Sequence, residues 1–195
     1  MKITIREVIP YTFQSFIFFA LSLFLGCIYA HYQPEQASQI FDAAARDAAS
    51  ITTQVTAYQA LDIFLNNSGI SLMMIFQGII IGFILKFRYG SYIALLFNGF
   101  MIGVISYISV ASDGILVLLL LTMIHGIIEL PTVFFSAGLG VMAGTRAKDR
   151  KFDRAALYST IKLFILVVVP FYAISAIIEA FITGGIVVPF LRQMA

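Results

Sequence analysis

Two side chains that could bind a metal ion or carry a proton lie four residues apart in an apolar run. His125 and Glu129 stand within residues 115–143, and this spacing places both on one face of a helix. Glu179 lies in a second apolar run. One imidazole and two carboxylates are donors that zinc accepts, with a water or a fourth ligand completing the set. We therefore take these three residues as candidate metal ligands.

Two other roles fit the same side chains. A hydrogen bond between His125 and Glu129 could lock two helices together, with Glu129 protonated. Alternatively, both residues could line a proton or ion pathway with Asn98, a mid-span amide that needs a partner on another helix. An ionised side chain at this depth costs about 2.5–3.5 kcal/mol on insertion scales, so a partner or a function must offset it. The residues alone leave the three roles open.

Known catalytic motifs are missing from the sequence. The metalloprotease pattern does not occur, because Ile127 and Ile128 precede Glu129 and no second histidine follows. A G-x-S-x-G elbow, a P-loop and a dinucleotide fingerprint are also absent. An intramembrane metal hydrolase would need an open coordination position and a separate base, for which the sequence offers few candidates. We therefore expect no enzymatic activity.

The composition determines the solvent in which these groups must work. Hydrophobic residues make up 61% of the 195 residues and charged residues only 11%, whereas ordinary globular domains carry about 25% charged residues. This excludes a soluble enzyme and a disordered chain, and the single cysteine, Cys27, excludes an intramolecular disulfide. A net charge of +2 gives no reason to expect nucleic acid. Lipid must surround most of the chain.

Several apolar runs are long enough to cross a bilayer, which takes about 20 helical residues. The first follows Lys2 and Arg6 as in a signal peptide, but it is bulky and has no clear cleavage site, so we interpret it as a retained anchor. The sequence predicts an all-α polytopic membrane bundle, with residues 1–195 as a single integral membrane domain. The five predicted spans cover about residues 10–32, 69–85, 89–110, 115–143 and 157–182.

The fourth run could be one span kinked at Pro131 or a re-entrant pair that returns to the same side. The positive-inside rule favours a kinked span. With the N-terminus inside, only Arg46 and Arg192 lie outside, whereas a re-entrant pair would place the basic loop 146–154 outside. We therefore expect a cytoplasmic N-terminus and an extracytoplasmic C-terminus in the cell membrane. The residues then predicted inside are Lys2, Arg6, Lys86, Arg88, Arg146, Lys148, Arg150, Lys151 and Arg154.

Residues 34–65 predict an amphipathic helix on the extracytoplasmic side. This helix could lie on lipid or against a partner, or it could pack on the chain's own bundle. Asn66, Asn67 and Ser68 follow it and are predicted to cap the second span. The apolar residues that recur at spacings of three and four are Phe41, Ala44, Ala48, Ile51, Val55, Tyr58 and Leu65.

Glycines occur in pairs at four-residue spacing inside three of the predicted spans. Such pairs let two helix backbones approach closely in lipid. We expect them to pack helices within one chain, and a homodimer interface is the alternative. The pairs are Gly78 with Gly82, Gly99 with Gly103, and Gly140 with Gly144.

Several of these motifs occur together in one known family. The most specific is HGIIELP at 125–131, followed by AGLG at 137–140 and IIEAFIT at 177–183, with Asn66-Asn67 and Asn98-Gly99 before them. Over about residues 66–183 the sequence resembles the stage II sporulation protein M family. The resemblance implies a multi-span membrane protein without established catalytic activity. The family's namesake anchors two peptidoglycan-degrading partners during engulfment, and relatives also occur in organisms that make no spores.

These observations favour a membrane scaffold that organises cell-wall hydrolases. Residues 34–65 would be the docking surface, and the lipid bilayer and the hydrolases would be the partners. The first alternative is a transporter or ion pathway through Asn98, His125 and Glu129. A metal-dependent intramembrane hydrolase is the second alternative, and we rank it last.

Overall fold

The chain forms a bundle of helices. A computed structural model describes residues 2–51 and 57–194, and these contain no strand. The all-α prediction is therefore confirmed. The α-helices are α1 (Ile5–Tyr32), α2 (Pro34–Ile51), α3 (Ala57–Leu85), α4 (Tyr92–Asp113), α5 (Ile115–Lys148), α6 (Arg154–Leu163), α7 (Val169–Ile177) and α8 (Val188–Met194), and the π-helices η1 (Phe164–Val168) and η2 (Ile178–Val187) join the last three.

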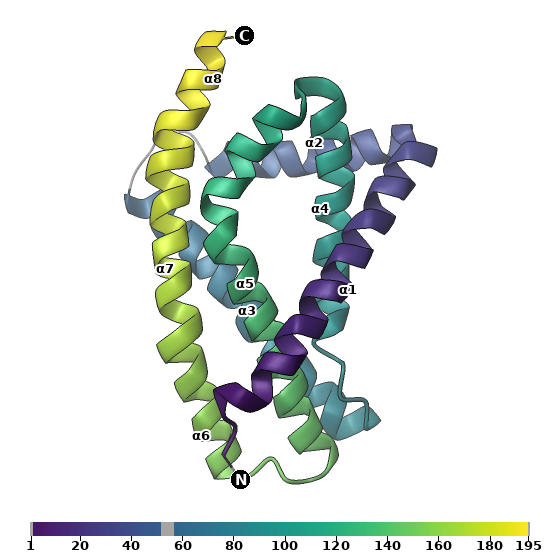
Figure 1. The fold of residues 1–195 in the computed structure, drawn as a ribbon, viewed down its shortest axis with the longest axis vertical. Coiled ribbons are helices and arrows are strands. Elements are labelled where there is room, and N and C mark those ends of the chain that lie inside the picture. The colour runs from purple at the N-terminus through teal and green to yellow at the C-terminus, as the bar shows by residue number, and fades with distance from the viewer. Residues whose placement is uncertain (1, 52–56, 195) are drawn as a thin grey trace.

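The helices include five stretches that are long and apolar enough to span a membrane, as the sequence predicts. The fourth belongs to α5, which is one curved helix with Pro131 in its interior and not a re-entrant pair (Figure 1). Because the number of spans is odd, the two termini lie at opposite ends of the bundle (Figure 1). The stretches are Ile5–Tyr32, Ala57–Leu85, Tyr92–Ser112, Thr122–Lys148 and Arg154–Leu191.

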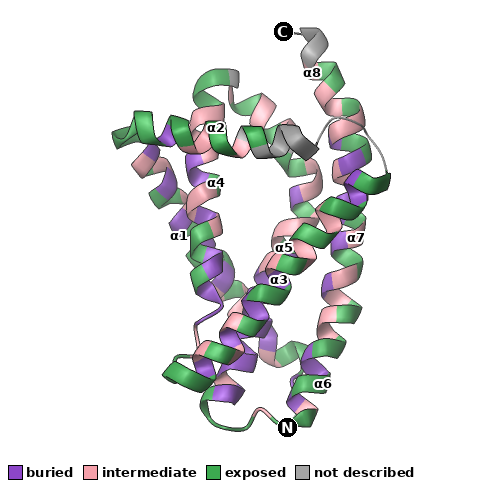
Figure 2. Cartoon of the chain, turned by 180° about the vertical axis from the view of Figure 1, so that it is seen from behind, coloured by how far each residue is buried: buried purple, intermediate pink, exposed green. Residues whose placement is uncertain are grey.

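Large apolar side chains cover the outside of the bundle. Phe13, Leu116 and Leu166 each expose more than 60% of their surface. Figure 2 shows exposed residues along the outer sides of the helices and buried residues where helices face each other. A soluble monomer rarely exposes so much contiguous apolar surface. The outer surface is therefore suited to lipid acyl chains.

The glycine pairs lie where helix backbones approach most closely within the chain. A Cβ at Gly78 or Gly82 of α3 would come within 3.0 Å of a carbonyl oxygen of α5, that of Gly140 or Gly144 respectively. Real Cβ atoms essentially never make such contacts. A Cβ at Gly99 or Gly103 of α4 would likewise come within 3.0 Å of a carbonyl oxygen of α1, that of Phe19 or Leu23 respectively.

The structure corrects the predicted start of the second span. Helix α3 begins at Ala57, so Asn66, Asn67 and Ser68 lie inside it and do not cap it. Residues 57–65 include Leu61, Phe64 and Leu65, which extend the apolar surface and allow the helix to continue. The local preference of asparagine for caps is therefore overridden by the apolar residues that precede it in α3.

The predicted amphipathic segment 34–65 is divided. Its first part is α2, residues 57–65 belong to α3, and Val55 lies outside the described residues. Helix α2 crosses the bundle at the end where α8 lies (Figure 1). Its residues Ala37 and Ile40 pack against Ala30 of α1 and Val104 of α4. This part of α2 therefore packs on the chain's own bundle, through residues that the predicted stripe did not include.

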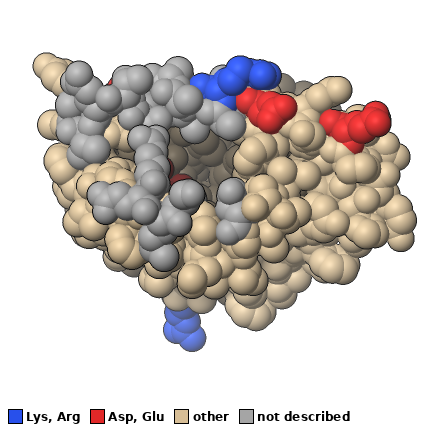
Figure 3. Space-filling view, turned by 90° about the horizontal axis from the view of Figure 1, so that it is seen from above, with Lys and Arg blue, Asp and Glu red and all other residues tan. Residues whose placement is uncertain are grey.

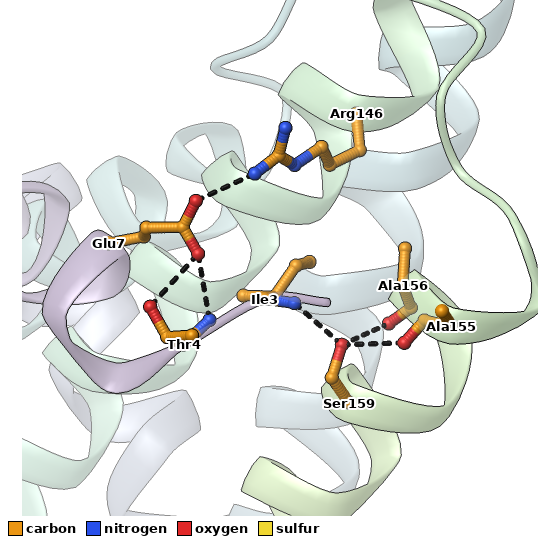
Figure 4. Close-up of polar contacts among 7 residues, drawn as sticks. All are labelled: Ile3, Thr4, Glu7, Arg146, Ala155, Ala156 and Ser159. Atoms are coloured by element: carbon orange, nitrogen blue, oxygen red, sulfur yellow. Dashed lines mark hydrogen bonds and ion pairs between the residues drawn. The ribbon is translucent and has the colours of Figure 1, made fainter. Parts of the chain in front are cut away.

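The opposite end is held together by polar contacts around the N-terminus (Figure 4). The Arg146 guanidinium lies 2.7 Å from a Glu7 carboxylate oxygen. The other Glu7 oxygen accepts hydrogen bonds from the backbone N–H and the hydroxyl of Thr4. The Ile3 N–H donates to the Ser159 hydroxyl of α6 at 2.8 Å. The sequence placed Arg146 in an aqueous loop, but α5 continues to Lys148 and buries it.

We expect the Arg146→Ala variant to lose about 1–2 kcal/mol of unfolding free energy. The arginine is buried, but its Glu7 partner is one-third exposed, so the loss should be smaller than for a fully buried pair. Lys148→Ala removes an exposed cation from the same helix end and serves as the control. Unfolding in detergent micelles measures both variants. Equal unfolding midpoints for the two variants would show that the ion pair contributes no measurable stability.

Candidate functional site

The three candidate ligands converge between two helices. His125 and Glu129 lie on α5, and Glu179 lies on η2. One donor atom from each residue lies within 4.8 Å of the other two, and all three residues are half-buried. The four-residue spacing on α5 places the first pair on one face, and the packing of η2 against α5 brings in the third.

Two buried hydroxyl groups of the last span surround this cluster. The Thr183 hydroxyl lies 3.4 Å from His125 Nδ1, and the Ser175 hydroxyl donates to Glu129 at 3.4 Å. The sequence analysis included Thr183 only as the last residue of the motif at 177–183 and did not mention Ser175. Their spacing could have predicted that they face the cluster. Four-residue intervals separate Ser175, Glu179 and Thr183, which places all three on one helix face.

The two carboxylates of the cluster have no cationic partner. Among the described residues, neither Glu129 nor Glu179 forms an ion pair with lysine or arginine. The ion pair between Arg146 and Glu7 lies far from the cluster, at the end of the bundle where the N-terminus is located. Any negative charge on the cluster must therefore be compensated by something other than a basic side chain.

A small cavity adjoins the cluster at Glu129. Its volume is about 70 Å³, which leaves room for a few water molecules. Asn98 lines this cavity, as does Asn67, which the sequence analysis interpreted as a cap. The full lining is Phe19, Asn67, Ile70, Asn98, Ile102, Glu129, Leu130, Val133 and Tyr172. The polar groups of α3, α4 and α5 thus face one small cavity.

Tyr172 attaches the last span to the rest of the bundle. Its side chain is fully buried, and its hydroxyl forms a 2.6 Å hydrogen bond with the Ser71 hydroxyl of α3. The hydroxyl–hydroxyl contact fixes α7 against α3 just before the chain reaches Glu179. The sequence analysis missed this pair, although Asn67 and Ser71 share a helix face at four-residue spacing.

The end of the molecule that carries α2 and α8 is hollowed. Figure 3 looks at this end and shows a depression with acidic side-chain atoms visible inside it. Basic and acidic groups also lie on the rim around it.

The comparison with protein families identifies the chain. The model of the stage II sporulation protein M family matches residues 15–184. The chain belongs to this family. None of the curated proteins matches the chain, and none of the solved structures does. The match confirms the resemblance and extends it, because it also includes α2 and most of α1.

Membership in the stage II sporulation protein M family also bears on activity. The family comprises membrane proteins that are generally non-enzymatic, and its name implies a role in sporulation. The three converging donors of this family member all lie within the matched residues. They could hold a cation or share a proton, and both uses are compatible with a protein that catalyses no reaction.

Proposed function

We propose that this protein is a non-catalytic scaffold that organises cell-wall hydrolases at the cell membrane. Two observations support the proposal. The chain belongs to the stage II sporulation protein M family, and its five candidate spans fix it in the bilayer. The observation that carries the docking role is the placement of α2, which lies across one end of the bundle (Figure 1).

Charge supports an orientation in which α2 faces the cell wall. The N-terminus and the α3–α4 and α5–α6 connections lie at the other end of the bundle (Figure 1). These segments and the helix ends beside them carry nine of the twelve lysine and arginine residues. In contrast, α2 and the last residue of α4 carry Glu35, Asp42, Asp47 and Asp113 against a single arginine, Arg46. The positive-inside rule places the basic end in the cytoplasm. The N-terminus is then cytoplasmic and the C-terminus extracytoplasmic.

The outward side of α2 is polar and suits a partner in water. Ala37 and Ile40 are turned toward the bundle, while Glu35, Gln39 and Asp42 are exposed. Packing on α1 and α4 holds the helix in place before any partner arrives, which lowers the entropic cost of binding. A hydrolase domain with a basic surface would complement the two acidic side chains.

We expect the combined Glu35→Lys and Asp42→Lys variant to lose most of its bound hydrolase. Two exposed charges are reversed without touching the packed side of α2, so the bundle should fold normally. The measurement is the peptidoglycan-degrading activity that co-purifies with the tagged protein from native membranes, and we expect about a tenfold decrease because reversed charges repel a basic partner.

Asp149→Lys is the matched control, since it reverses an exposed acidic residue at the other end of the bundle. Undiminished recovery of activity with the α2 variant would argue against docking on this helix. Point substitutions are preferable to deleting residues 34–65, because a deletion of that length would remove the first turns of α3.

The small cavity beside Glu129 gives limited support to an ion pathway. Asn67, Asn98 and Glu129 supply its polar lining, but most of the remaining lining is apolar, and the volume is only about 70 Å³. A continuous pathway needs polar groups that reach both surfaces. The scaffold role therefore accounts better for the arrangement.

A further inference from the structure

We propose that His125, Glu129 and Glu179 bind one divalent cation, and that the cation is zinc. The site would lie between α5 and η2, within the membrane-spanning part of the bundle. This inference is independent of docking on α2 and adds a metal ion to a protein for which a scaffold role is proposed. It rests on the charge of the cluster, the geometry of its donors and the groups around them.

Charge is the first argument. Glu129 and Glu179 lie on helices long and apolar enough to span the membrane, and no lysine or arginine among the described residues pairs with either. If both carboxylates are ionised, the cluster carries two negative charges in a medium that disfavours them. A single divalent cation neutralises both. A monovalent cation or one shared proton would leave a net charge.

The donor positions are close enough to converge on one ion. The three donor atoms lie within 4.8 Å of one another. Zinc binds imidazole nitrogen at about 2.0–2.1 Å and carboxylate oxygen at about 2.0–2.2 Å, so tetrahedral ligands lie roughly 3.4 Å apart. Side-chain rotations that move the donors by about 1 Å are sufficient, because glutamate has three rotatable side-chain bonds.

The surrounding hydroxyl groups orient the ligands. Thr183 engages His125 Nδ1, which leaves Nε2 as the ring nitrogen for the ion. Metal-bound histidine almost always uses its other ring nitrogen in this way. Ser175 donates to one oxygen of Glu129 and leaves the other oxygen for the metal. Both hydroxyl groups are buried, so water does not compete for these contacts.

The donor set favours zinc over magnesium and calcium. Magnesium and calcium prefer sites made entirely of oxygen ligands, whereas zinc accepts imidazole together with carboxylates. With three protein ligands, one tetrahedral position stays open for a water molecule. The cavity beside Glu129 offers space for such a water, and Asn98 and Asn67 line the same space. The ion would then bridge α5 and the last span.

The experiment measures bound metal in the full chain, purified in mild detergent from cells grown with added zinc. We expect about one zinc ion per chain in the wild type. The His125→Ala and Glu129→Gln variants should each lose at least nine-tenths of it. His31→Ala and Glu35→Gln are matched controls, because they remove the other histidine and an exposed glutamate of α2, and both should keep the wild-type zinc content.

A second measurement uses the wild type alone, so the test does not depend on whether a variant folds. After chelation and dialysis, zinc added alone should raise the apparent unfolding temperature by about 5–10 °C at a hundredfold excess over the dissociation constant. A wild type that carries no metal and shows no shift with zinc would overturn the proposal, and the carboxylates would then be neutralised by protons. Equal zinc loss from the cluster variants and the controls would also overturn it.

Discussion

In the Gly78→Ala variant, we expect the free energy of unfolding to fall by about 2–3 kcal/mol. The added methyl group would collide with the Gly140 backbone of α5, where both the carbonyl oxygen and its carbon lie within 3.0 Å of the new Cβ. Overpacking of a core typically costs about 1–3 kcal/mol. The value should lie at the upper end, because a helix backbone cannot rotate away as a side chain can.

Gly69→Ala provides the control on the same helix. It also replaces a glycine of α3, but no atom lies within 4 Å of the new Cβ. Its stability should stay unchanged or rise slightly, since alanine favours the helix more than glycine does. Unfolding in mixed micelles, followed by circular dichroism, measures both variants. If both lose the same stability, close packing of α3 on α5 is not what holds this interface together.

The Tyr172→Ala variant should lose about 3–5 kcal/mol, the range found when a large buried aromatic side chain is truncated. Tyr172 is fully buried, and its hydroxyl is hydrogen-bonded to the Ser71 hydroxyl. Its removal leaves a cavity between α7 and α3 and weakens the attachment of the last span. Because Glu179 follows on that span, the carboxylate should also lose its fixed position beside His125.

Two further variants separate the contributions of the ring and the hydroxyl. Tyr172→Phe keeps the ring and leaves Ser71 without its partner, so a loss of only about 1 kcal/mol is expected. Phe171→Ala truncates the neighbouring aromatic residue, which is half exposed on the outer surface, and should change stability little. The same micelle unfolding assay applies. A Phe171→Ala loss as large as that of Tyr172→Ala would show that burial at Tyr172 is not the cause.

The sequence was sufficient to predict the spans, because length and apolar character alone decide which segments enter lipid. The residues at which helices begin and end were harder to predict. Asn67 has the local character of a cap, yet it lies inside α3 and lines the cavity with Asn98. A cap preference is a local property, whereas an amide inside a helix is stabilised by groups on other helices, which no sequence window includes.

The candidate site was predictable in part. The spacing of His125 and Glu129 follows from helix geometry, but the approach of Glu179 depends on how η2 packs against α5, which spacing does not determine. The same limit applies to Arg146, whose partner Glu7 lies 139 positions earlier in the chain. The alternating charges of residues 146–154 predict a loop in water. Only the position of α1 shows that Arg146, the first residue of this segment, is buried.

The π-helical stretch η2 has a consequence for the C-terminal end. A π-helix makes wider turns than an α-helix and occurs mostly as short insertions. Each residue of a π-helix therefore turns the chain through a smaller angle than the about 100° per residue of an α-helix, so the π-helical residues of η2 change the rotation of α8 about its own axis. The direction in which α8 presents its side chains is therefore determined by the segment before it.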